Sequence, residues 1–146
     1  MIAITDSNII ISAFITPKGT VAKIFKDKSQ IQFIAPSFLK TEISNHFDKI
    51  VKLSELSKKE VQLALDYYFE RITFIDISNI PKKYIIESYL IVSDIDADDV
   101  FFVALNLYKN HKIWTLDKVL IKGLEAKGYK ICITTAELKA SLYKKQ

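Results

Sequence analysis

The chain has 146 residues, a mass of 16.7 kDa, 49% hydrophobic residues and 26% charged residues. This length and apolar content fit one globular domain over residues 1–146, and no apolar run approaches the roughly 20 residues of a transmembrane helix. The single cysteine excludes an internal disulfide and suits the cytoplasm, and the net charge of +4 permits contact with nucleic acid without demonstrating it. We therefore expect a cytoplasmic protein that does not enter a membrane.

Five short segments rich in isoleucine, valine and phenylalanine are predicted to be β-strands. They alternate with longer segments of helical periodicity, which is typical of an α/β fold with a parallel sheet. Most of them are apolar throughout, as expected where helices cover both faces of a sheet. The predicted fold is an α/β/α sandwich around a parallel sheet of about five strands. These strands are Ile2–Thr5, Ile31–Ala35, Thr73–Ile77, Ile113–Leu116 and Tyr129–Ile133.

Capping signals mark the beginnings of several helices. Ser57 and Glu60 form an S-x-x-E capping box before the segment VQLALDYYFERI. Pro81 suits the first position of a helix through KKYIIESYLIV. Thr134 and Glu137 are predicted to open the last helix.

Two aspartates directly follow predicted strands. Asp6 comes after the first strand in IAITDSN, and Asp117 comes after the fourth in KIWTLDK. In open α/β sheets, ligands bind at the carboxyl ends of the strands, in the crevice where the strand order reverses. Aspartate is also a common helix N-cap, so capping explains either residue alone about as well as a binding site does. The pair together favours a site.

A third acid, Glu42, lies in the predicted helix PSFLKTEISNHFDKIV. Glu42 falls on the inward face of this helix, together with Leu39 and His46. The alternative is a boundary residue that reaches water or pairs with a lysine, and this segment alone favours that alternative. The apolar stripe of the helix consists of Leu39, Ile43, His46 or Phe47, and Ile50.

The stretch DIDADDVFFVALNLY carries four aspartates in its first six positions and is then almost wholly apolar. Asp96, Asp98 and Asp99 are predicted to lie at the cap and first turn of a buried helix. The helix dipole accounts for one or two acids, at roughly 0.3 to 1 kcal/mol each, but three crowded carboxylates repel one another. A divalent cation would offset this repulsion. Two histidines and one cysteine cannot assemble a zinc site of nitrogen and sulfur ligands, whereas carboxylates suit Mg²⁺ or Mn²⁺. The acids therefore predict a metal-assisted phosphodiesterase.

The order of these motifs resembles the PIN-domain ribonuclease family. TDSNIIISAF, PSFLKTEI, DADDVFFVALNL and WTLDKVL match the family pattern in order, and the resemblance extends from Ile2 to about Leu138. It implies that the catalytic acids, which are also ligands of Mg²⁺ or Mn²⁺, are Asp6, Glu42, Asp99 and Asp117. Asp96 matches an additional metal-binding acid of the D-x-D-D form of the motif.

The same resemblance gives supporting roles to three residues. Asn8 matches the asparagine of the family's D-T-N motif, in which Ser7 here replaces the threonine. Thr115 matches the threonine of a T-x-D motif and would hydrogen-bond the first acid, although a plain strand threonine is an equally good interpretation. Asp98 either coordinates metal or only caps the helix, because neighbouring helical residues point about 100° apart.

The resemblance also implies an endoribonuclease, with single-stranded RNA as the favoured substrate. Because an acidic pocket repels phosphates, basic residues around it must hold the RNA. Lys118 and Lys122 follow Asp117 closely and are the first candidates, with Lys18 and Lys40 as weaker ones. A solvated surface is the alternative for any single lysine in so lysine-rich a chain.

Partners are also implied by the family. We expect a homodimer and, because many compact PIN proteins are VapC-like toxins, an antitoxin protein as a further partner. The TLDK ending differs from the commoner toxin motif, so the toxin role is a subordinate hypothesis. The alternative function is a catalytically silent PIN-like module that binds RNA or protein. The presence of all four acids favours the enzyme.

Overall fold

The computed structural model describes residues 1–27 and 31–143. Its strands in this part of the chain are β1 (Ile2–Thr5), β2 (Gln32–Pro36), β3 (Ile72–Ile75), β4 (Ile113–Trp114) and β5 (Cys132–Ile133). They form one parallel sheet in the order β3-β2-β1-β4-β5. The predicted α/β class and the parallel sheet are confirmed.

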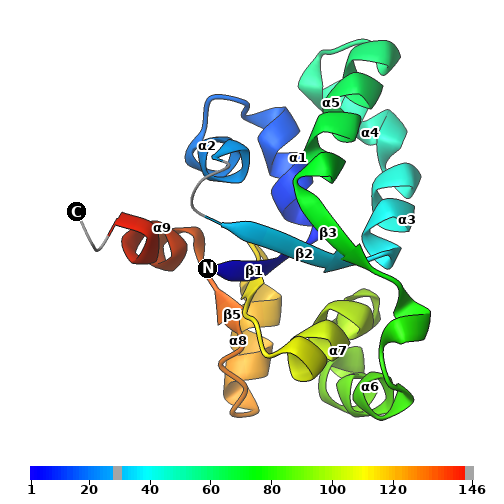
Figure 1. Cartoon of the computed structure of the whole chain (residues 1–146), viewed down its shortest axis with the longest axis vertical. Coiled ribbons are helices and arrows are strands. Elements are labelled where there is room, and N and C mark those ends of the chain that lie inside the picture. Colours follow the sequence, from blue (N-terminus) through cyan, green and yellow to red (C-terminus); the bar gives the residue numbers. More distant parts are fainter. Residues whose placement is uncertain (28–30, 144–146) are drawn as a thin grey trace.

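Helices lie on both sides of this sheet (Figure 1). The helices are α1 (Ser7–Ile15), α2 (Thr20–Lys26), α3 (Phe38–Asn45), α4 (Phe47–Ser54), α5 (Lys58–Glu70), α6 (Lys82–Asp96), α7 (Val100–Lys109), α8 (Lys118–Ala126) and α9 (Thr135–Tyr143). Short 3-10 turns, η1 (Ile77–Asn79) and η2 (Ala97–Asp99), connect some of them. Helices α1 to α5 lie on one side of the sheet, and α6, α7 and α8 lie on the other. No helix of the described residues is long and apolar enough to cross a membrane.

The strand order creates a switch point beside the central strand β1. The chain adds β2 and β3 on one side of β1 and then crosses over to add β4 and β5 on the other. Thr5 pairs with Trp114 in the register of β1 and β4. The residues that follow these two strands, beginning with Asp6 and Thr115, therefore emerge at the same edge, where open α/β sheets bind ligands.

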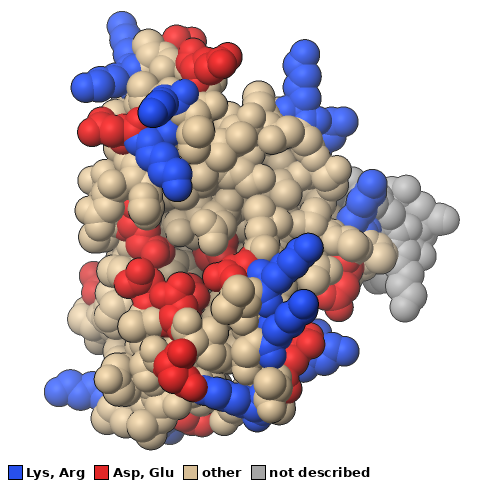
Figure 2. Space-filling view, turned by 180° about the vertical axis from the view of Figure 1, so that it is seen from behind, with Lys and Arg blue, Asp and Glu red and all other residues tan. Residues whose placement is uncertain are grey.

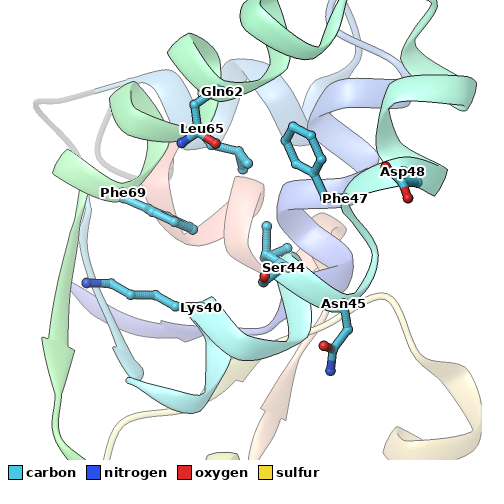
Figure 3. Close-up of a pocket in the computed structure, with 9 residues that line it drawn as sticks. Lys40, Ser44, Asn45, Phe47, Asp48, Gln62, Leu65 and Phe69 are labelled. Atoms are coloured by element: carbon cyan, nitrogen blue, oxygen red, sulfur yellow. The ribbon is translucent and has the colours of Figure 1, made fainter.

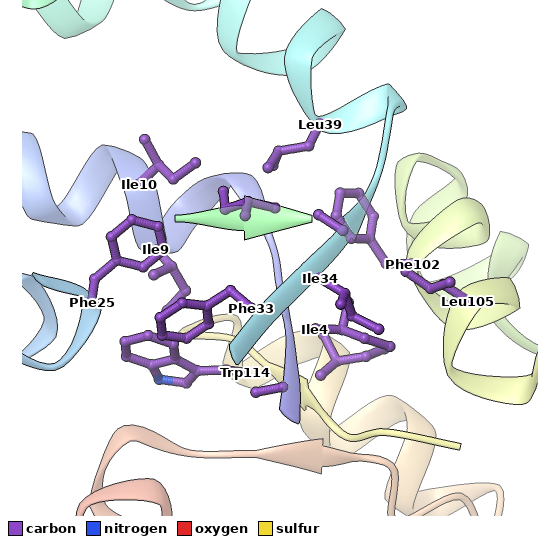
Figure 4. Close-up of a cluster of buried hydrophobic side chains, with 14 of the residues drawn as sticks. Ile4, Ile9, Ile10, Phe25, Phe33, Ile34, Leu39, Phe102, Leu105 and Trp114 are labelled. Atoms are coloured by element: carbon purple, nitrogen blue, oxygen red, sulfur yellow. The ribbon is translucent and has the colours of Figure 1, made fainter. Parts of the chain in front are cut away.

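The hydrophobic core packs against both faces of the sheet (Figure 4). On one face, the Phe33 ring stacks on Phe25 of α2 and on Trp114, with ring centroids 4.7 Å and 5.7 Å apart. On the other face, Ile4 and the fully buried Phe102 of α7 lie together. This packing holds the strand ends that carry the acids in place, because close-packed side chains leave little room for movement.

The helix starts predicted from Ser57, Pro81 and Thr134 agree with the structure to within one residue. The Ser57 hydroxyl accepts the N–H of Glu60, and the Glu60 carboxylate accepts the N–H of Ser57, both at 3.1 Å. Thr134 and Glu137 exchange the same pair of bonds at 3.1 Å. Pro81 lies just before α6, as its N-cap, rather than at its first position.

Predicted strand ends were less accurate. β5 begins at Cys132 and not at Tyr129, because the N–H of Tyr129 still donates to the carbonyl of Leu124 and closes α8. β3 ends before residue 77, because the Asp76 carboxylate accepts the N–H of Ser78 and begins η1. β2 ends one residue later than predicted and β4 two residues earlier.

The helix predicted over PSFLKTEISNHFDKIV is in fact two helices, α3 and α4. His46 separates them, with φ −103° and ψ 10°, outside the helical region. Its side chain is exposed, so His46 does not belong to the apolar stripe, whereas Phe47 is half-buried. Glu42 remains within α3, ahead of the break.

Candidate metal centre

The densest group of acids lies where α6 meets α7. Helix α6 ends at Asp96, the turn η2 follows, and α7 begins at Val100. The prediction of a single helix start for these acids was therefore wrong, because they straddle a junction. The N–H of Asp98 donates to the Asp96 carboxylate at 3.0 Å. Asp96 therefore caps this turn, and the side chain of Asp98 is exposed.

Three carboxylates converge at this junction. Oxygens of Asp96, Asp99 and Asp117 lie within 4.8 Å of one another. Two of these acids come from the α6–α7 junction and the third from the end of β4. Magnesium–oxygen distances are about 2.0–2.1 Å, so ligand oxygens on opposite sides of one ion lie about 4 Å apart. The three oxygens come close to this spacing, so the three carboxylates form a group that can hold a metal ion.

Asp6 and Asp117 are held in place as helix N-caps. Asp6 accepts the N–H of Ile9 at 3.2 Å. Asp117 accepts the N–H groups of Val119 and Leu120 at 3.0 and 3.1 Å. Each carboxylate has two oxygens with several acceptor positions, so capping orients both groups without exhausting them. Capping and membership of the site are therefore compatible.

Thr115 lies between these two strand-end acids and is buried. Its hydroxyl donates a hydrogen bond to the Asp6 carboxylate, which lowers the pKa of that group. The same hydroxyl accepts the N–H of Asp117 at 3.1 Å. Thr115 therefore fixes the position of one acid relative to the other.

Glu42 reaches the cluster from α3. Burial raises the pKa of its carboxyl to about 7, and repulsion from Asp6, Asp98 and Asp96 acts in the same direction. The Ser7 hydroxyl donates to this carboxylate and lowers its pKa. Glu42 Oε1 is nevertheless buried without a hydrogen-bond partner among the described residues. In the sequence, Ser7 stands out only because it replaces the threonine of the D-T-N motif. Its position next to Asp6 was the one sequence feature that could have pointed to its contact with Glu42.

Asp99 lies at the electrostatic centre of the acids. Burial, together with repulsion from Asp96, Asp6, Glu42 and Asp117, raises the pKa of Asp99 to about 8. Burial also raises the pKa of Asp6 to about 6, helped by repulsion from Asp117. Burial and mutual repulsion therefore disfavour the ionised forms of Asp6 and Asp99. A cation among them would restore their ionised forms and displace protons.

The donor set fits a hard divalent cation. All the converging groups are carboxylates, which suit Mg²⁺ or Mn²⁺. The orphaned Glu42 Oε1 adds an oxygen that the protein itself leaves unsatisfied. A buried acceptor without a partner costs roughly 1–3 kcal/mol, and a cation would remove that cost. Glu42 is thus the residue whose burial most clearly needs a ligand.

Asn8 and three of the predicted lysines lie on the surface. The backbone N–H of Asn8 donates to Asp6, and its exposed side chain borders a groove shared with Asp117. Lys118 and Lys122 are exposed on α8, and Lys18 is exposed in the turn after α1. Figure 2 shows acidic side chains gathered in the middle of one face of the molecule, with basic side chains beside them.

The structure does not bring Lys40 to the acids. Its Nζ lies 4.4 Å from the ring centroid of Phe74. Lys40 instead lines a separate hollow of about 450 Å³ between α3, α4 and α5, together with Phe47 and Phe69 (Figure 3). Positions 40 and 42 of α3 point about 200° apart, so Lys40 and Glu42 lie on different sides of the helix.

The chain matches the family model of the PIN domain over residues 4–142. Its fold is similar to that in a crystal structure of VapBC2 from Rickettsia felis bound to a DNA fragment from their promoter. The TM-score is 0.67 and the sequence identity 19%, over 92% of this chain and 97% of that chain. No curated protein matches the chain significantly. Since the family model spans nearly the whole chain and all of the clustered acids, the chain belongs to the PIN-domain family.

Proposed function

We propose that this protein is a divalent-cation-dependent endoribonuclease that hydrolyses phosphodiester bonds of single-stranded RNA. The PIN domains are a family of nucleases. The observation that carries the proposal is the convergence of Asp96, Asp99 and Asp117 within 4.8 Å, at the switch point of the sheet. Asp6 and Glu42 adjoin this trio and repel Asp99. A divalent cation would offset this concentration of negative charge.

The residues that would hold Mg²⁺ or Mn²⁺ are Asp6, Glu42, Asp96, Asp99 and Asp117. The bound cation would supply positive charge that activates a water molecule and stabilises the charge developing on the phosphodiester. Helix capping and Thr115 keep the strand-end acids in position during the reaction. One carboxylate accepts the proton of the attacking water as general base, and the product carries a 5′-phosphate.

Lysines outside the acidic centre would bind the RNA backbone. Lys118 and Lys122 lie on α8, which begins directly after Asp117, and both are exposed. Lys18 is exposed beyond the far end of α1, and Lys40 would contact nucleotides farther from the cut. Each lysine–phosphate contact releases counterions, so RNA binding should weaken steeply as salt is raised.

We further propose that the nuclease is the toxin of a toxin-antitoxin pair in the cytoplasm. The similarity of its fold to VapBC2, whose crystal structure includes a DNA fragment from their promoter, supports this role. Induced expression of the wild-type chain should stop growth of the host cells, and expression of Asp99→Asn should not. A small protein encoded beside the gene should relieve the arrest when both are expressed. Growth arrest by Asp99→Asn would contradict a toxic nuclease activity.

An exposed apolar surface on α6 supports a homodimer. Ile86, Tyr89 and Leu90 are each more than half exposed, and they border a groove of about 460 Å³ with Val100 and Phe101. Contiguous exposed apolar side chains mark interaction sites. Light scattering should therefore give a dimer mass for the wild type and a monomer mass for Leu90→Glu.

The direct test is cleavage of a mixed single-stranded RNA with Mn²⁺, with Mg²⁺ and with EDTA. Wild type should cut only with metal, and Asp99→Asn should not cut. Asp66→Asn is the matched control, since this exposed α5 residue accepts a bond from Gln62 that asparagine can also accept. Equal cutting by Asp99→Asn would refute the proposed site. Tight Mn²⁺ binding without any cutting would favour the catalytically silent binding module.

A further inference from the structure

A groove extends from the acidic centre along α1. It has a volume of about 330 Å³, within the roughly 300–1,000 Å³ typical of small-molecule sites. It begins at the acids and ends at the turn after α1. Its lining residues are Asn8, Ile11, Ser12, Ile15, Thr16, Leu116 and Asp117.

One face of α1 forms most of this groove. Positions 8, 11, 12, 15 and 16 follow the spacing of a single helical face and extend over about 12 Å. A helix side that faces solvent is ordinarily polar, but this one carries Ile11 and Ile15. Ile15 is 45% exposed, and Leu116 across the groove is 38% exposed. The groove therefore presents apolar walls beside a strongly polar site.

The groove is continuous with the acidic centre. Asp117 belongs to both, and Asn8 contributes its backbone N–H to Asp6 and its side chain to the groove. A nucleotide whose phosphate lies at the acids would therefore place its neighbouring groups in the groove. Asp117 is the charged member of the lining, so a second phosphate would be repelled there, whereas a neutral group would be accepted.

We propose that this groove seats the nucleobase next to the scissile phosphate. The inference rests on the ribonuclease function proposed above. The faces of the base would lie against Ile15 and Leu116, since base faces are apolar and such contacts tolerate every base. The polar edge of the base would meet Asn8, Ser12 and Thr16, which offer both donors and acceptors.

Exposed lysines lie near both ends of the groove. Lys118 follows Asp117 at one end of the groove, and Lys18 lies just beyond Thr16 at the other. Lys18 would hold the phosphate on the far side of the base, and Lys118 would hold the phosphate beyond the scissile one, both outside the repulsion of the acids. A segment of a partner protein is the competing occupant, and the experiment below separates the two.

The test combines protein variants with RNAs that lack one base. The cut site is first mapped in a short single-stranded RNA with Mn²⁺, and an abasic nucleotide is then placed at each position around it. Removing the base next to the cut should lower the wild-type kcat/KM about tenfold. Ile15→Ala should lower kcat/KM severalfold on the intact RNA and cause no further loss on that abasic RNA, because both changes remove the same contact.

A charge variant makes the test sharper. Ile15→Glu should lower kcat/KM on intact RNA at least tenfold, mainly through KM, while its Mn²⁺ affinity by calorimetry stays that of the wild type. Leu63→Glu, at an exposed leucine of α5, is the matched control and should leave kcat/KM unchanged. Unchanged kcat/KM in Ile15→Glu, or additive losses with the abasic RNA, would overturn the proposal that the groove binds the base and would favour a partner protein as its occupant. Failure of the wild type to cut any RNA would overturn the ribonuclease function and the base seat together.

Discussion

Replacing Asp99 by asparagine should stabilise the metal-free protein at alkaline pH. The pKa of Asp99 rises from 3.8 to about 8 on folding, so the native state binds this proton more tightly than the unfolded state does. The stabilisation from the bound proton is complete below the unfolded pKa and is lost as the pH rises through the folded pKa. Each tenfold change in proton affinity is worth about 1.4 kcal/mol, or roughly 6 kcal/mol for the whole change.

Asparagine cannot ionise, so the variant avoids this loss. The four other acids keep repelling one another in the variant, so only part of the free energy is recovered. We therefore expect the variant to be roughly 1–3 kcal/mol more stable than the wild type at pH 8. For a chain of this length, that gain raises the melting temperature by about 3–10 °C. The gain should shrink steadily as the pH falls towards 4.

Thermal unfolding followed by circular dichroism, in EDTA between pH 4 and 8, measures this difference. Adding Mn²⁺ should reverse the order of stability, because only the wild type binds the ion tightly, and a concentration of 100 times Kd adds about 2.7 kcal/mol. Asp66→Asn should follow the wild type throughout. A lower melting temperature for Asp99→Asn in EDTA at pH 8 would refute the claim that uncompensated carboxylates converge at this position.

Further predictions concern protons, positioning and stability. Calorimetry in buffers of different ionisation enthalpy should show that Mn²⁺ binding at pH 7 releases protons. The apparent Mn²⁺ affinity should rise up to about pH 8, the pKa of Asp99, and an affinity that does not change with pH would contradict this prediction. Thr115→Val removes the hydroxyl bonded to Asp6 and should weaken Mn²⁺ binding about tenfold with the fold intact, as measured by calorimetry and circular dichroism. Ser57→Ala breaks the capping box of α5 and should cost about 1 kcal/mol in urea unfolding without changing the cleavage rate. Trp114→Ala should cost about 3–5 kcal/mol in the same assay, because its side chain is fully buried.

The acids at the strand ends were predictable because topology alone brings them together. Once the sheet is parallel, residues that follow its strands share one edge, which brings Asp6 and Asp117 to the same edge. The choice among neighbouring acids was not predictable in the same way. Whether Asp96 or Asp98 caps the turn depends on the backbone angles of the α6–α7 junction, which three adjacent acids do not specify.

Features that depend on packing between distant segments could not be predicted from the sequence. The break at His46 arises between two helices that both suit a helical pattern, and only the structure shows His46 exposed. The groove needs Leu116 opposite α1, two segments far apart along the chain. Lys40 is a different case, because helical spacing alone places it on a different side of α3 from Glu42.

The measurement that bears most directly on a metal-dependent ribonuclease is a joint titration with Mn²⁺. RNA cleavage rate and Mn²⁺ binding are followed over the same concentrations in wild type and in Asp117→Asn. We predict that the midpoint of activation coincides with the binding midpoint in the wild type, and that both move together to higher Mn²⁺ in the variant. Cleavage that persists in EDTA, or that saturates independently of binding at the acids, would contradict the account.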